Sequence, residues 1–260
     1  MKISTVFLLI VLTILPGLSP AQEIHQKFAG IEAGMTFISG EMSDMDYIRG
    51  DIPYATGYYS PPYLKSMMYK GFAGIKSEFV SLNNKFGFSG GVRFSQINCS
   101  VGRNSYWGGS TDYFYLFYRQ DGVNTEYLKV KELNQRSSYI GIPLEIRFFP
   151  YRARLFRMYF KLGAEFGFKL QTQTDVVFFN KEMDIYQEEA GAMIDQPESF
   201  SSSLYGAAGL RIGRESKPAI SIEICLPSVF LTSKMSGLVN PVYGGGFQMN
   251  FQIPIKSTVK

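Results

Sequence analysis

The chain has 260 residues, a formal net charge of +4 and a mean hydropathy of −0.03. Lys and Arg are not gathered on one segment, so the charge gives no support for a nucleic-acid-binding protein. Aromatic residues make up 15% of the chain and charged residues 18%, and Gly occurs 26 times. Dispersed aromatic residues and Gly are typical of membrane β-barrels, but a soluble β-sandwich also uses aromatic residues.

The N-terminus has the pattern of a secretory signal. A short basic start leads into an apolar run over residues 6–15, which Pro16 and Gly17 end. Ser19-Pro20-Ala21 is a small-x-small cleavage site, so we expect a signal peptide over 1–21 and a mature chain from Gln22. No later window holds ~18 consecutive apolar residues, so we expect no transmembrane helix. An exported chain of this kind is either soluble or a membrane β-barrel.

The mature chain repeats strands in which apolar and polar residues alternate. The clearest runs from Met158 to Gln171, where one face is wholly apolar and the other carries Lys, Glu and Gly. Successive side chains of a strand point to opposite faces, so one face fits lipid and the other an enclosed, crowded interior. The same two-faced pattern recurs in eight segments, which are 29–37, 69–81, 86–95, 139–148, 158–171, 204–213, 220–226 and 246–255.

The connections between these segments alternate between short and long. Short ones fall at 82–84, 150–156 and 215–218, and long ones at 40–68, 99–137, 175–199 and 228–241. This alternation is typical of the periplasmic turns and extracellular loops of outer-membrane barrels. We therefore predict an all-β, antiparallel up-and-down transmembrane barrel of eight strands over 28–256. A linker at 22–27 and a tail at 257–260 place both termini in the periplasm.

The second long connection contains a hairpin pattern of its own. Residues 113–119 and 126–131 flank Asp121-Gly122, a favoured tight-turn pair. We interpret them as an extracellular extension, because neither half has a clean lipid face of the ~9–11 residues that a crossing needs. A barrel of ten strands is the alternative.

One part of the sequence resembles a known family. The stretch Tyr139-Ile140-Gly141-Ile142-Pro143-Leu144-Glu145-Ile146-Arg147-Phe148, followed by the Gly-containing segment 160–167, is similar to the PorT-type outer-membrane β-barrel family. The resemblance implies an outer-membrane location and an eight-stranded fold. The family's namesake belongs to a protein-secretion apparatus, so the resemblance also implies a link to secretion.

Charged residues on the interior face of the strands are the main candidate functional residues. By alternation they are Glu32, Lys76, Glu78, Arg93, Glu145, Arg147, Lys161, Glu165, Lys169, Arg211 and Glu223. Five acids nearly balance six bases, and an eight-stranded interior is just wide enough for side chains to fill. We predict a structural network of ion pairs that plugs the lumen. A polar path for ions or small solutes, as in a small channel, is the alternative.

Enzymatic and metal chemistry have little support. The only His is His25, which we place before the first strand at the periplasmic end, far from any outer-rim active site. No His or Cys cluster has metal-ligand spacing, so we expect no catalytic, cofactor or metal site. Cys99 and Cys225 fall on opposite walls of an eight-stranded barrel, and we expect free, buried thiols.

Two loops could engage partners. Tyr47, Tyr54, Tyr58, Tyr59 and Tyr63 in the first long connection form a binding surface, or else their rings close the barrel mouth or lie in the lipid headgroup region. The third long connection is acidic, which we interpret as a solvated charge run. We expect a non-enzymatic barrel whose loops or wall meet outer-membrane lipid, lipopolysaccharide or a protein partner of the outer membrane or of secretion.

Overall fold

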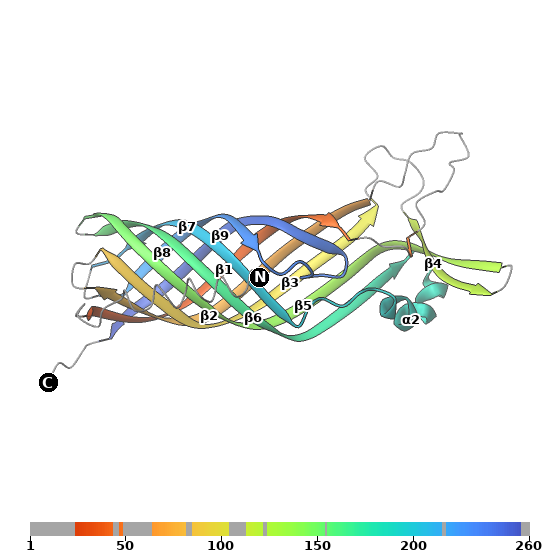
Figure 1. The fold of residues 1–260 in the computed structure, drawn as a ribbon, viewed down its shortest axis with the longest axis horizontal. Coiled ribbons are helices and arrows are strands. Elements are labelled where there is room, and N and C mark those ends of the chain that lie inside the picture. The colour runs from red at the N-terminus through yellow and green to blue at the C-terminus, as the bar shows by residue number, and fades with distance from the viewer. Residues whose placement is uncertain are drawn as a thin grey trace, which may run out of the picture.

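The computed structural model describes residues 24–43, 47–48, 64–81, 85–103, 113–121, 124–153, 155–214 and 217–255. Long antiparallel strands wind around a common axis and form an elongated barrel (Figure 1). The strands are β1 Ile24–Met42, β2 Leu64–Ser81, β3 Phe86–Arg103, β4 Phe114–Asp121, β5 Asn124–Arg152, β6 Phe156–Phe178, β7 Phe200–Ile212, β8 Ala219–Phe230 and β9 Val239–Ile255. Two short helices, η1 Lys181–Tyr186 and α2 Gln187–Ala192, follow β6.

Eight of the strands close into a ring. Each pairs antiparallel with its neighbours in the order β3-β2-β1-β9-β8-β7-β6-β5, and β3 pairs back onto β5. The first and last strands meet over a long register, from Lys27 opposite Ile255 to Met42 opposite Val239. The predicted eight-stranded up-and-down barrel is confirmed.

The predicted hairpin in the second long connection lies outside the ring. Among the described strands β4 pairs only with the beginning of β5, and an isolated bridge joins Leu116 to Ile48. Within the ring β3 contacts β5 directly, with Phe94 opposite Ile140 and Phe86 opposite Phe148. The alternative of ten membrane-crossing strands is therefore wrong, because no gap in the ring is left for β4.

The strands are longer than the sequence pattern predicts. β1 already begins at Ile24, so His25 lies within the first strand rather than before it, and part of the predicted linker 22–27 is strand. At the other end β3 runs to Arg103 and β6 to Phe178. We call the end with the short connections the inner end of the barrel, and the end with the long connections the outer end. The extra length lies mostly at the outer end.

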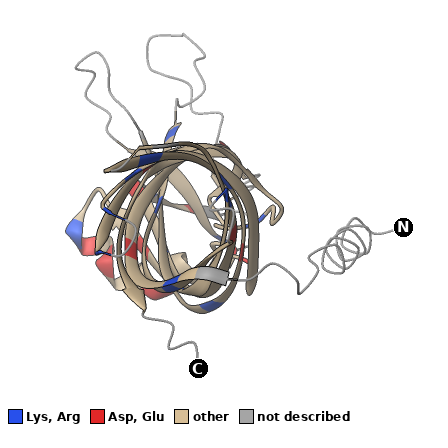
Figure 2. Cartoon of the chain, turned by 90° about the vertical axis from the view of Figure 1, so that its left-hand side faces the viewer, with Lys and Arg blue, Asp and Glu red and all other residues tan. Residues whose placement is uncertain are grey.

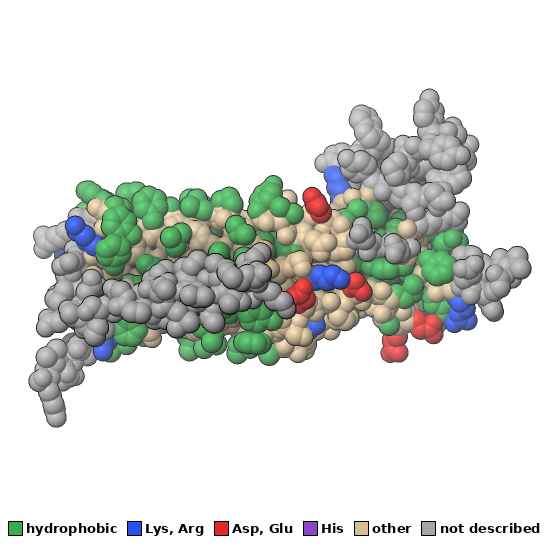
Figure 3. Space-filling view, viewed as in Figure 1, with side chains coloured by type: hydrophobic (Ala, Val, Ile, Leu, Met, Phe, Trp, Pro, Cys, Tyr) green, Lys and Arg blue, Asp and Glu red, His purple; other side chains and the backbone are tan. Residues whose placement is uncertain are grey.

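On the face that Figure 3 shows, apolar side chains cover the outside of the ring toward its inner end. In β5 the outward side chains Ile140, Ile142 and Leu144 are 44–51% exposed. The same holds for the outward residues of neighbouring strands, such as Leu162 at 73% and Ile224 at 68%. A soluble domain rarely exposes so large a continuous apolar surface, whereas lipid covers it at no cost. We call this surface the apolar belt.

Beyond the belt the strands keep their alternation but exchange the two faces. Outward positions of β3 and β5 become polar, as at Gln96, Asn98 and Arg136. Inward positions become apolar and fully buried, as at Ile97 and Leu133. The outer part of the barrel therefore resembles a water-soluble β-protein, with its core inside.

This core forms a cluster that we call the apolar cap, at the outer end of the lumen. It draws residues from the ring, from the β4–β5 hairpin, from α2 and from the segment before β9. Its buried members are Ile38, Met68, Ile97, Cys99, Val101, Phe114, Leu116, Leu128, Val130, Leu133, Tyr139, Val176, Phe178, Ala190, Ile194, Met235, Leu238 and Val239. The described parts of the long connections thus fold over the mouth of the barrel.

A buried amide fastens two of these connections. The Gln135 side chain donates from Nε2 to the carbonyl of Asp195 at 2.9 Å, and its Oε1 accepts from Ser236 Oγ at 2.8 Å and from the Gly237 amide at 2.7 Å. A Cβ on Gly237 would lie 1.9 Å from the Asp195 carbonyl oxygen, so only Gly allows this close approach. One glutamine of β5 therefore ties the segments before β7 and before β9 together.

We predict that Leu144→Arg impairs assembly, because Leu144 lies in the middle of the apolar belt and is 51% exposed. An Arg near the bilayer midplane costs about 2–4 kcal/mol. Urea titration of the barrel in liposomes measures the loss. The control is Asn134→Arg, an outward position of the same strand beyond the belt, which should unfold like the unchanged protein. Equal stability of the two variants would show that Leu144 does not face lipid.

Candidate functional site

The lumen is filled in three layers, inside the ring that Figure 2 shows from its inner end. At the inner end Phe28, Val80 and Phe149 are at most 2% exposed and form an apolar floor. The apolar cap closes the outer end. Between floor and cap lies a network of buried charges, because alternation along each strand brings the polar face of the sequence inward.

Glu145 is the centre of this network. Its carboxylate forms ion pairs with Lys161 at 3.0 Å and with Lys76 at 3.2 Å. Arg147 at 3.2 Å and Arg93 at 3.5 Å complete a set of four cations from four strands. Ser89 Oγ and Tyr205 OH donate to the same carboxylate at 2.9 Å and 3.0 Å. The acid is 3% exposed, so these contacts replace the water that it loses.

A second group of charges lies toward the floor. Arg147 donates to Glu78 at 3.1 Å and to Glu223 at 3.0 Å, and so links both to the centre. Arg211 also reaches Glu78, at 3.3 Å, and its guanidinium lies 4.1 Å from the centre of the Phe28 ring. Lys161 pairs with Glu223. Each carboxylate here therefore meets two cations.

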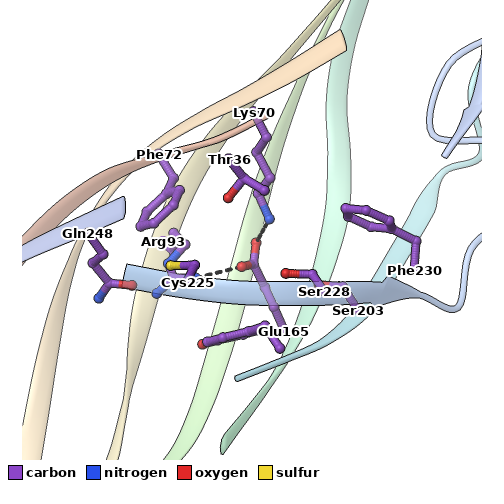
Figure 4. A pocket seen from close by; sticks show the side chains of 11 residues that line it. Thr36, Lys70, Phe72, Arg93, Glu165, Ser203, Cys225, Ser228, Phe230 and Gln248 are labelled. Atoms are coloured by element: carbon purple, nitrogen blue, oxygen red, sulfur yellow. Dashed lines mark hydrogen bonds and ion pairs between the residues drawn. The ribbon is translucent and has the colours of Figure 1, made fainter. Parts of the chain in front are cut away.

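A third group lies toward the cap. Arg93 bridges two acids, with Nε 2.6 Å from Glu32 and Nη1 2.6 Å from Glu165. Its guanidinium carbon lies 4.3 Å from the centre of the Phe72 ring. Lys70 pairs with Glu165 on the other side (Figure 4). A cavity of about 20 Å³ lies beside these residues, room for one water molecule.

The structure brings nearly all of the eleven predicted interior charges into this network. The exception is Lys169, which is half-buried and donates to the carbonyl of Pro197 at 2.6 Å. It lies near the outer end and holds the connection before β7 in place. No ion pair joins Lys169 to the acids of the network within the described part of the chain.

Several interior residues were missed by the sequence analysis. Lys70 lies on the same interior face as Lys76 and Glu78 by alternation, but it was not among the predicted interior charges. Arg157 is likewise buried on the interior face of β6. Amides of β9 also join the network, as Gln248 Nε2 donates to Glu32 at 2.8 Å.

Two tyrosines fill the lumen where the facing strand has Gly. Tyr205 pairs across the strands with Gly163, and a Cβ there would lie 2.5 Å from the Tyr205 ring. Tyr159 covers Gly209 in the same way at 2.5 Å. Each ring then reaches an acid with its hydroxyl, Tyr159 donating to Glu223 at 2.7 Å. Gly on the interior face of one predicted strand and Tyr on the interior face of the next is the sequence pattern that could have identified these two tyrosines.

The two cysteines are free thiols. Cys99 lies buried in the apolar cap, and burial raises the pKa of its thiol to about 11. Cys225 is half-buried and lines the small cavity beside Arg93. The expectation of free thiols is confirmed, although Cys225 is less buried than expected.

The two candidate binding loops are only partly described. Tyr47 packs against the apolar cap, and burial with the nearby Asp195 carboxylate raises its pKa to about 12. This tyrosine therefore helps to close the mouth, whereas Tyr54, Tyr58, Tyr59 and Tyr63 lie outside the described residues. The acids of the third long connection are exposed on η1, α2 and the segment after them; they are Glu182, Asp184, Glu188, Glu189, Asp195 and Glu198.

Two further features, a metal site and a membrane-spanning helix, are absent from the described residues. No group of three or more His, Cys, Asp or Glu side chains there could hold a metal ion. No helix in the same residues is long and apolar enough to cross a membrane.

Ring closure, an apolar outer wall and a charged, filled interior together define the class of protein to which the chain belongs. Inside lipid every backbone polar group must be bonded within the protein, and a closed barrel meets this requirement. The chain is an outer-membrane-type β-barrel of eight strands.

Comparisons with solved structures find other outer-membrane proteins. The chain is similar to the outer membrane protein OprG from Pseudomonas aeruginosa, with a TM-score of 0.45 and 13% identity over 91% of this chain and 99% of that one. Ail of Yersinia pestis, solved with the heparin analogue sucrose octasulfate, gives a TM-score of 0.36 and 14% identity over 88% and 99%. The E. coli outer membrane protein W gives 0.31 and 10% over 89% and 99%. No family model and no curated protein matches the chain.

We predict that Glu145→Gln destabilises the barrel by about 3–5 kcal/mol, because it removes the charge that compensates four buried cations. Urea titration in liposomes measures the free energy of unfolding. Glu182→Gln, an exposed acid of η1, is the matched control and should change this free energy by no more than about 0.5 kcal/mol. Equal stability of Glu145→Gln and the control would refute the central role of Glu145.

Proposed function

We propose that the protein is a non-enzymatic outer-membrane barrel with a closed lumen, which acts as a structural or partner-binding component. One observation carries the proposal. The interior is packed from the floor through the ion-pair network to the apolar cap, and the cavity beside Arg93 and Glu165 holds only about one water. A function that needs passage through such a lumen first requires the packing to break.

The proposed orientation follows from the two ends of the barrel. The inner end, with the short connections and the beginning of β1, faces the periplasm, so both termini lie there. The outer end, with the apolar cap and the β4–β5 hairpin, faces the exterior. Bacterial barrels place short turns on the periplasmic side and longer loops outside, which supports this assignment.

Because the lumen is filled, a partner would contact the loops or the outer wall of the barrel. A partner in the outer membrane fits a barrel whose interior is occupied by its own side chains. The similarity of residues 139–148 and 160–167 to PorT-type barrels suggests a secretion apparatus as that partner. Cross-linking in intact cells, followed by identification of the captured proteins, tests this. Recovery of secretion components supports the role, and capture of lipid alone contradicts it.

A small channel for ions or solutes is the second candidate function. Charged side chains continue along the interior from Arg211 near the floor to Lys70 near the cap, which would favour a polar path. The outer side of this path is closed by the packing of the apolar cap and by hydrogen bonds such as those of Gln135. A conducting state would require the cap, the ion-pair network and the floor all to rearrange.

We predict that the purified barrel gives no stable conductance steps in a planar bilayer, since the interior is filled along its length. Gln135→Ala should remain non-conducting, because the floor and the ion-pair network still block the lumen. Stable, reproducible steps from the unchanged protein would overturn the closed-lumen proposal and favour the channel. Steps from Gln135→Ala alone would identify the apolar cap as a gate and equally contradict a permanently closed lumen.

A further inference from the structure

We propose that a groove on the outer wall of the barrel binds the phosphorylated sugar headgroup of a glycolipid in the outer leaflet. We call it the rim groove. It is lined on the outside of β2, β3, β5 and β6 by Tyr69, Asn98, Ser100, Asn134, Arg136 and Asp175. The proposal rests on the proposed outer-membrane orientation and does not depend on whether the lumen conducts.

The rim groove lies just beyond the apolar belt. Phe94, Ile140 and Phe168 form one row across three strands. Phe94 and Ile140 are the last large apolar outward residues of the belt on β3 and β5, and on β6 the exposed Leu170 extends it slightly further. Asn98 comes four residues later on β3, about 13 Å along the strand at ~3.3 Å per residue. With a strand tilt of about 40° the groove lies roughly 10 Å above this row, at the level of lipid headgroups. Figure 3 shows the polar, partly charged zone that follows the belt.

The size and lining of the groove fit a sugar. Its volume is about 340 Å³, within the ~300–1,000 Å³ of small-molecule sites. The amides of Asn98 and Asn134 each offer donors and an acceptor, and the Ser100 hydroxyl offers both. Tyr69 adds a half-buried aromatic ring at the edge nearest the belt. Neutral groups that both donate and accept match the hydroxyl groups of a sugar.

Arg136 provides the charge for a phosphate. It is exposed and lies directly opposite Asn98 in the register. Its Nε donates to Asn98 Oδ1 at 3.2 Å, and the same oxygen accepts from Gln96 Nε2 at 3.0 Å. No ion pair or hydrogen bond engages its two terminal nitrogens within the described part of the chain. A guanidinium fixed through Nε with both terminal nitrogens open is suited to a phosphate, which it binds through two parallel hydrogen bonds.

Two acids make the groove selective. Glu132 and Asp175 line it beside Arg136, so its formal charge is negative even with the arginine counted. Asp175 is oriented by Gln173, whose Nε2 donates to Oδ1 at 3.3 Å. Carboxylates repel a simple anion but accept hydrogen bonds from sugar hydroxyls. A phosphorylated sugar satisfies both kinds of group, whereas phosphatidylglycerol, whose headgroup has only two hydroxyl groups, satisfies the carboxylates less fully.

Binding of defined lipids to the purified full chain in uncharged detergent tests the proposal. The probes are bisphosphorylated lipid A, its dephosphorylated form and phosphatidylglycerol, with bound lipid counted by native mass spectrometry. We expect Arg136→Gln to weaken binding of bisphosphorylated lipid A about tenfold, the loss of one charged hydrogen-bonded contact. Asn98→Ala removes the hydrogen bond that orients the Arg136 guanidinium, so it should also weaken binding of bisphosphorylated lipid A. Arg119→Gln, an exposed arginine on the β4–β5 hairpin, should leave binding unchanged.

The dephosphorylated probe should bind more weakly and equally well to the unchanged protein and to Arg136→Gln. Two results would overturn the proposal: unchanged affinity of Arg136→Gln for bisphosphorylated lipid A, or equal binding of phosphatidylglycerol and lipid A. A gel shift on heating checks that each variant is folded. Failure here leaves the closed lumen untouched, because conductance does not involve Arg136, and a conducting barrel could still bind the glycolipid.

Discussion

Closure of the ring between β1 and β9 is the constraint on which the rest of the structure depends. Lipid offers no partner to a backbone amide or carbonyl, so the last strand must pair with the first. Once the ring is closed, alternation along each strand divides the sequence into an outward and an inward set. The outward set meets lipid along the belt, and the inward set has to fill a narrow interior. The fold therefore decides the chemistry of both faces.

Inside the barrel, the narrow closed interior requires that buried charges compensate one another. A buried carboxylate with no partner is costly, and each acid of the network meets at least two cations. Glu145, Arg93 and Arg147 connect all groups of charges into one body. Removing one partner leaves others uncompensated, so such a network resists rearrangement. The same property that makes the lumen stable makes it a poor path for solutes.

Alternation predicted the strands, their number and most interior charges, because in lipid the two faces differ sharply in polarity. The pattern failed where the faces exchange roles. Ile97, Cys99 and Val101 are apolar inward residues of β3, and nothing in the local sequence shows that they continue the same strand into the apolar cap. Lys70 was missed near the edge of a segment. Lys169 lies farther toward the outer end than the acids of the network, and it bonds the Pro197 carbonyl instead. The rim groove depends on side chains from four strands, which no single segment reveals.

The central claim is that one continuous set of strands has an apolar outside in the membrane and a polar outside above it. Nitroxide labels placed one at a time at Val92, Phe94, Gln96, Asn98 and Ser100, successive outward positions of β3, test this in liposomes. Relaxation by oxygen, which concentrates in lipid, should dominate at Val92 and Phe94. Relaxation by a water-soluble nickel complex should dominate at Asn98 and Ser100. Oxygen dominance that continues through Ser100, or nickel access at Val92, would contradict the account.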